Sequence, residues 1–73
     1  MDGPTLMEGI ESAIRGAAEG QKVTLVVLSV GKGVSVSKEE IVQRLSQEFP
    51  SASIELLDGG AVGSVTVKEI EVE

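Results

Sequence analysis

The sequence contains no cysteine and no histidine, and Phe49 is its one aromatic residue. Without cysteine there is no disulfide and no thiolate zinc site, so the fold has to be stabilised by packing alone. The serine–histidine and cysteine–histidine mechanisms of nucleophilic catalysis are excluded as well. We therefore expect a core of Val, Ile, Leu and Ala side chains, no enzymatic activity, and no metal or cofactor.

Basic residues are scarce, with six Lys and Arg against twelve Asp and Glu and a net charge of −6. Nucleic acids and anionic membranes are bound by clustered Lys and Arg, so neither is expected as a partner. The longest apolar run, near residues 23–30, is much shorter than the roughly 20 residues that span a bilayer. The N-terminus lacks the basic and apolar regions of a signal peptide. A cytoplasmic location is expected.

The chain has 73 residues, which predicts a single domain over residues 1–73 near the lower size limit for independent folding. A chain of this size buries only about 60% of its unfolded surface. Burial against a second subunit would add to its stability. A protein partner is therefore expected, and a homo-oligomer is the simplest form of it.

Residues 5–19 have the spacing of an amphipathic helix, in which Glu11 and Arg15 form an i,i+4 ion pair. Gly9 and Gly16 weaken this helix by about 1 kcal/mol each. Residues 22–30 are β-branched and almost continuously apolar, which predicts a central strand with both faces covered. The apolar residues expected on the buried stripe of the helix are Leu6, Ile10, Ala13, Ile14, Ala17 and Ala18.

Residues 37–40 have the sequence of a capping box, in which Ser37 accepts a hydrogen bond from the amide of Glu40. The helix that begins here is expected to end before Pro50, because the residue preceding proline avoids helical geometry. On its exposed side, Glu40 and Arg44 are expected to form an ion pair.

Residues 53–57 and residues 64 to about 72 predict two further strands, joined by a glycine-rich connection in which Asp58-Gly59 is a hairpin signal. A shift in the apolar phase predicts a bulge near Lys68 and Glu69, or a strand that passes into a different environment. The right-handed crossover makes the first two strands parallel, and the last is expected to return antiparallel as a hairpin. The predicted fold is an α+β two-layer sandwich of order α-β-α-β-β, with two helices on a three-stranded mixed sheet.

The loop of residues 31–37 leads from a strand to a helix N-terminus, a place where anions bind well. However, Val36 stands where a dinucleotide fingerprint needs glycine, and Gly33 stands where a P-loop needs Ser or Thr. An ordinary turn before a capped helix is therefore favoured over a phosphate site. The residues that would contact an anion here are Lys32, Gly33, Ser35 and Ser37.

Glu69, Glu71 and Glu73 alternate along the last strand. Three carboxylates on one strand face are ligands that a hard cation accepts. Charges at an exposed edge or chain end also prevent pairing with other chains. The second interpretation is favoured, and no metal site is predicted.

From residue 31 to residue 73 the sequence contains a pattern of residues and short motifs that is found in a known family. The pattern consists of Gly31, Val34, Ser37-Lys38-Glu39-Glu40, Leu45, Phe49-Pro50, Ile54-Glu55-Leu56, Gly59-Gly60 and Ile70-Glu71-Val72-Glu73. In this pattern residues 31–73 resemble the C-terminal domain of the fatty acid kinase large-subunit family, relatives of dihydroxyacetone kinase. The resemblance implies a domain that holds a partner subunit carrying the acyl chain, apart from the nucleotide site. Where that family has Gln-Pro and aromatic residues after the double glycine, this sequence has Ala61-Val62-Gly63-Ser64.

The first predicted strand is apolar on both sides, with Val23, Leu25 and Val27 on one face and Val26, Leu28 and Val30 on the other. If both helices lie on one side of the sheet, the second face is an exposed apolar patch, which marks an interface. We therefore predict a non-catalytic protein–protein interaction module that self-associates through a sheet face or edge. The expected interface residues are Val26, Leu28, Val30, Gly59, Gly60 and Val62.

Two alternatives stay open at this point. The acidic balance is also compatible with a small inhibitor or nucleic-acid mimic that blocks a basic site on a larger protein, although its carboxylates are spread along the whole chain. The other alternative is a binder of small anionic ligands at residues 31–37.

Overall fold

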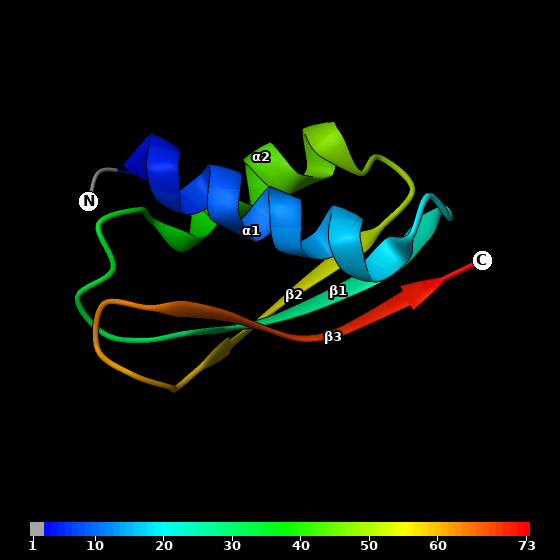
Figure 1. The fold of residues 1–73 in the computed structure, drawn as a ribbon. Coiled ribbons are helices and arrows are strands. Elements are labelled where there is room, and N and C mark those ends of the chain that lie inside the picture. The colour runs from blue at the N-terminus through cyan, green and yellow to red at the C-terminus, as the bar shows by residue number, and fades with distance from the viewer. Residues whose placement is uncertain (1–2) are drawn as a thin grey trace.

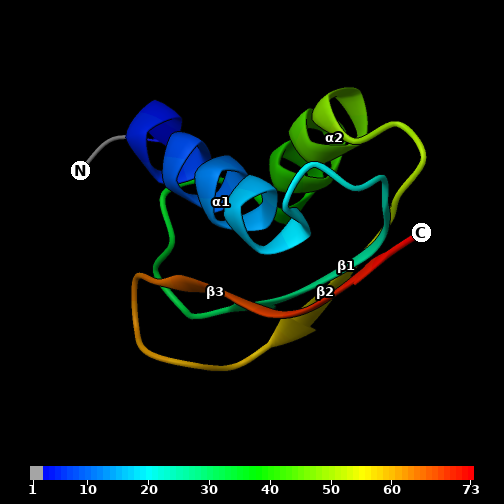
Figure 2. The same ribbon diagram turned by 45° about the vertical axis from the view of Figure 1, so that its right-hand side comes forward.

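Two helices and three strands follow one another in the order α-β-α-β-β, in a computed structural model that describes residues 3–73 (Figure 1). Both helices lie on the same face of the sheet (Figure 2), which gives the predicted two-layer α+β fold. The elements are α1 (Gly3–Ala18), β1 (Val23–Val30), α2 (Lys38–Glu48), β2 (Ser53–Asp58) and β3 (Val65–Val72).

The strand order is β2-β1-β3, so the almost continuously apolar β1 is central, as predicted. It pairs parallel with β2 and antiparallel with β3. The predicted hairpin between β2 and β3 is wrong, because β3 pairs with β1 instead. Pairing on both sides gives the backbone groups of β1 partners along both of its edges. The glycine-rich connection, residues 59–64, is long enough to cross past the end of β1.

This crossing brings the connection against the end of β1 at Gly31. The amide of Gly31 donates to the carbonyl of Ser64 at 2.9 Å, and the amide of Gly63 donates to the carbonyl of Lys32 at 2.6 Å. A Cβ atom on Gly31 would lie 2.0 Å from the carbonyl oxygen of Ala61. The crossing therefore requires glycine at position 31.

The predicted bulge in β3 is confirmed at Lys68. Val27 is opposite Glu69, whereas Leu28 is opposite Val67, so Lys68 is the extra residue. A second register shift between Val23 and Leu25 was not predicted. It changes the side-chain alternation, so that Val23 is 5% exposed and joins the buried face of β1.

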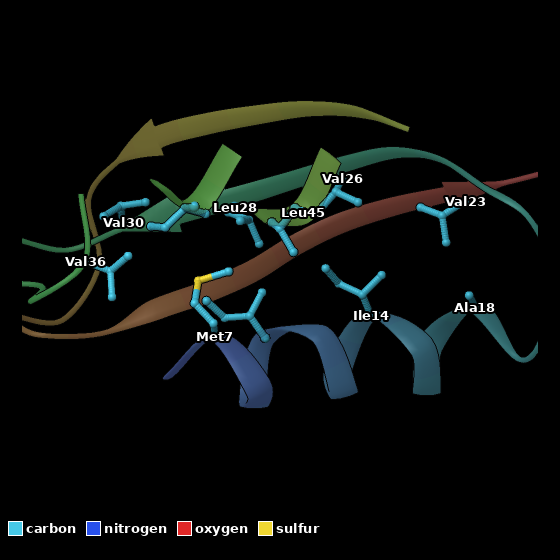
Figure 3. Close-up of a cluster of buried hydrophobic side chains, with 11 residues drawn as sticks. Met7, Ile14, Ala18, Val23, Val26, Leu28, Val30, Val36 and Leu45 are labelled. Atoms are coloured by element: carbon cyan, nitrogen blue, oxygen red, sulfur yellow. The ribbon is translucent and has the colours of Figure 1, made fainter. Parts of the chain in front are cut away.

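The core lies between the helices and the inner face of the sheet (Figure 3), where side chains of α1 and β1 point toward one another. Almost all of it is aliphatic, as the composition predicts. Its fully or almost fully buried members are Met7, Ile10, Ile14, Ala18, Val23, Val26, Leu28, Val30, Val36, Ile41 and Leu45.

The buried face of α1 differs from the predicted stripe. Ala13 and Ala17 are exposed, and Met7 and Glu11 are buried in addition to the expected isoleucines. The helix is thus rotated about its axis relative to the predicted orientation. We attribute the rotation to Met7, whose long side chain fills the space beneath the helix better than alanine does.

The buried carboxylate of Glu11 links the two helices. Its Oε1 lies 3.6 Å from Nη2 of Arg15, which confirms the predicted i,i+4 pair. Its Oε2 lies 3.2 Å from Nε of Arg44 on α2, an ion pair in which the N–H is not aligned as a hydrogen bond. The predicted pair of Glu40 with Arg44 is wrong, because a carboxylate removed from water attracts the cation more strongly than an exposed one does.

Helix α2 begins as its sequence predicts. The Ser37 hydroxyl accepts from the amide of Glu40 at 3.1 Å, with the N-cap backbone extended. Val36 and Ile41, on either side of the cap, are both buried. The cap and the apolar residues around it fix the point where the chain leaves the sheet layer and enters the helix layer.

Candidate interaction surface

The face of the sheet opposite the helices, which we term the outer face, has no covering element in the part of the chain that the structure describes (Figure 2). Strand register places one set of side chains there, because directly paired residues share a face. The outer-face residues are Leu25, Val27 and Ser29 of β1, Ser53, Glu55 and Leu57 of β2, and Thr66, Glu69 and Glu71 of β3.

The middle of the outer face is apolar. Leu25 and Val27 on the central strand are half-buried by their neighbours, and Leu57 on β2 is 44% exposed. A nearly continuous apolar strand is typical of a sheet covered on both sides. Here β1 is covered on one side only, and the outer face keeps apolar surface in contact with water.

Carboxylates flank this apolar strip. Glu55 is opposite Val27 on one side and Glu69 is opposite Val27 on the other, while Glu71 is opposite Leu25. The ion pairs found among residues 3–73 involve other acids, namely Glu11, Glu48, Asp58 and Glu73. The outer face is therefore an apolar strip between two acidic borders.

The predicted interface residues on β1 lie on the wrong face. Val26 and Leu28 are 0% exposed and Val30 is 6% exposed, all beneath the helices. The sequence pattern is apolar on both faces of β1 and does not distinguish which of them the helices cover. The apolar residues of β1 on the outer face are instead the half-buried Leu25 and Val27, which the interface prediction missed.

The other predicted interface residues lie in the connection between β2 and β3. Gly59 and Gly60 are exposed, and Val62 is 81% exposed. They border a cavity of about 680 Å³ at the carboxyl ends of β1 and β2. The structure thus brings these residues together at one end of the sheet, where the hydroxyl of the outer-face residue Ser29 donates to the carbonyl of Gly59 at 2.8 Å.

The same cavity contains part of the predicted anion site. Lys32 lines it, whereas Ser35 does not, and the Ser37 hydroxyl is engaged as the helix cap. The sequence interpretation missed Lys38 and Asp58, which form an ion pair at the cavity wall. An anion placed here would meet the Asp58 carboxylate together with the lysines, so the arrangement does not favour phosphate.

A second cavity, of about 360 Å³, lies where the two helices end. Arg15 lines it, lies 5.7 Å above the ring of Phe49, and contacts Glu48 at 2.5 Å and Glu11 at 3.6 Å. The positive charge of Arg15 is thus already neutralised within the chain. This cluster joins α1 to the end of α2 and leaves no unpaired cation for a ligand.

Residues 3–73 contain no group of three acidic side chains placed to hold a metal ion, so Glu69, Glu71 and Glu73 do not converge. Among these residues there is also no helix of the length and apolar character needed to cross a bilayer. Comparison of the chain with protein-family models, with curated proteins and with solved structures finds no match.

Proposed function

We propose that this protein is a non-catalytic protein–protein interaction module that self-associates through its sheet. The observation that carries the proposal is the placement of both helices on one face of the sheet. Within residues 3–73, this leaves the outer face and two strand edges without intramolecular cover. Leu25, Val27 and Leu57 are the apolar residues on this uncovered side.

The energetic argument follows from the size of the chain. Burial of apolar surface contributes about 25 cal/mol for each Å² removed from water. A small domain whose central strand is covered on one side only forgoes part of that stabilisation. A second protein surface against the sheet restores it. The resemblance of residues 31–73 to a domain that holds a partner subunit supports the protein-binding part of the proposal, but not self-association.

The acidic-inhibitor alternative is less well supported by the geometry. A mimic of nucleic acid presents its carboxylates in a row that imitates phosphates. On the outer face, Glu55 lies on β2 while Glu69 and Glu71 lie on β3, and the apolar strip of β1 separates the two groups. The carboxylates form borders around an apolar contact surface, which favours an interaction module.

Sedimentation equilibrium from micromolar to millimolar concentration tests the proposal. The mean mass is expected to rise with concentration toward that of an oligomer. Amide chemical shifts recorded over the same range should move in the sheet, while the exposed helical residues Ser12 and Gln43 serve as internal controls and stay in place. A constant monomer mass over the full range, or shifts confined to the helices, would contradict it.

A further inference from the structure

We infer that β2 is the strand through which a second copy of the chain binds, by antiparallel pairing of β2 with β2 of the second copy. The two three-stranded sheets then form one continuous sheet. This inference rests on the proposed function and adds to it the partner, the strand and the register.

One hydrogen bond identifies the backbone groups that are free on β2. The amide of Gly59 donates to the carbonyl of Val30 at 3.0 Å, so the polar groups of residue 59 face β1. Backbone N–H and C=O groups alternate in direction along a strand. Residues 53, 55 and 57 therefore also face β1, whereas Ile54, Leu56 and Asp58 direct their N–H and C=O groups away from it, toward the open edge.

The second sheet edge, on β3, is unsuited to such pairing. The bulge at Lys68 interrupts its backbone repeat, and three of the four residues from Lys68 to Glu71 are charged. Bulges and charges are the devices that prevent one edge strand from pairing with another. In contrast, β2 (Ser53–Asp58) contains no proline and keeps an uninterrupted register with β1. Of the two edges, β2 is the one open to a new strand.

Symmetry and alternation together restrict the pairing. Two identical edges related by a two-fold axis pair antiparallel. Since the free groups belong to Ile54, Leu56 and Asp58, these residues have to face one another. One register places Leu56 opposite Leu56 of the second copy and Ile54 opposite Asp58 of the second copy.

Strand length disfavours the register centred on Leu57, because Ile54 would then be opposite Gly60, beyond the end of β2. Charge disfavours the other neighbouring register, which is centred on Glu55. With Leu56 at the two-fold axis, Glu55 is opposite Leu57 of the second copy. A shift by two residues would place Glu55 opposite Glu55 of the second copy in a close pair, with Cα atoms about 4.5 Å apart. Like charges directly opposite each other destabilise a strand pair. The register centred on Leu56 avoids this repulsion.

The pairing also determines where the remaining surface lies. Opposite residues of an antiparallel pair point to the same side of a sheet, so the helices of both copies cover the same face. The outer faces of the two copies then join into one larger surface. Because Leu25 and Val27 lie on that surface and away from the β2 edge, Val27→Asp is expected to leave the dimer intact.

Amide hydrogen exchange by NMR tests the pairing in the unmodified protein. At concentrations where the dimer forms, exchange at Leu56 and Ile54 should slow at least tenfold relative to dilute protein. The amide of Ile70 is a matched control on the other edge: Glu73 donates to Lys22 at 2.9 Å, so alternation directs Ile70 away from β1. Its exchange should not depend on association.

Charge substitution at Leu57 tests the register. Leu57→Lys and Leu57→Glu both remove the leucine, but they place opposite charges against Glu55 of the second copy. The lysine variant is expected to dimerise about tenfold more tightly than the glutamate variant, since the two opposed pairs attract in the first and repel in the second. Gln43→Lys and Gln43→Glu, on the exposed side of α2, control for net charge and should differ much less.

The outcomes separate this inference from the proposed function. A dimer that is abolished by Val27→Asp and leaves Ile54 and Leu56 unprotected would overturn pairing through β2, yet uphold self-association through the outer face. A chain that stays monomeric at millimolar concentration would overturn both. Protection of Leu56 and Ile54 together with a dimer that survives Val27→Asp would establish the β2 interface.

Discussion

At the scale of single residues, Gly31 is the glycine at which an added methyl group is expected to destabilise the fold most. A Cβ atom would lie 2.0 Å from the Ala61 carbonyl oxygen, which is backbone and cannot rotate away. We expect Gly31→Ala to lower the free energy of unfolding by at least about 2 kcal/mol, because insertion of atoms into a closely packed site forces the backbone apart. The midpoint of urea unfolding, at unchanged m-value, measures this loss.

Gly16 provides the matched control for the same chemical change. It lies within α1, and a Cβ atom there would meet nothing within 4 Å. Gly16→Ala should therefore raise the free energy of unfolding by about 0.5–1 kcal/mol, since alanine loses less backbone entropy in a helix. Equal effects at the two glycines would show that the close approach of residues 59–64 to β1 is not required for the fold.

At the scale of elements, Glu11 joins α1 to α2 from a buried position. Replacement by alanine removes both ion contacts and leaves Arg44 without its partner. Glu11→Ala is expected to destabilise the protein by about 2 kcal/mol, within the range of hydrogen bonds and ion contacts to charged groups. Glu8→Ala, at an exposed position of the same helix, should change stability by no more than about 0.5 kcal/mol. If thermal unfolding shows equal losses, Glu11 does not hold the helices together.

The positions of the elements are predictable from this sequence, but their pairing is only partly so. Local signals set the ends of the helices and strands, such as the Ser37 cap and the phase shift at Lys68, and both are found where expected. The Asp58-Gly59 signal marks the end of β2 correctly, but it does not identify the strand with which the following strand pairs. Strand order depends on the pairing of β1 along both of its edges. This pairing is a property of the whole sheet and not of one segment.

At the scale of the molecule, the covered face of the sheet could not be read from the chain. Val26 and Leu28 form the core and Leu25 and Val27 the outer face, yet all four are aliphatic residues of similar size. Periodicity distinguishes the two faces of a strand without saying which one a helix covers. The sequence pattern therefore names the buried Val26 and Leu28 as interface residues, whereas the apolar residues of the uncovered face are Leu25 and Val27.

Association of this small domain should be visible in its thermal stability. A ligand that binds only the folded state stabilises it more as its concentration rises, and here the ligand is a second copy of the chain. A hundredfold rise in protein concentration stabilises the folded dimer by about 2.7 kcal/mol. Because a dimer contains two chains, the stabilisation per chain is about half of this value. Since 1 kcal/mol shifts the Tm of a domain of this size by about 4–8 °C, we expect a rise of about 5–10 °C. Leu57→Glu, which places a second carboxylate against Glu55 at the β2 interface, should flatten this dependence. A Tm of the unmodified protein that does not change with concentration would show that association does not contribute to the stability of the fold.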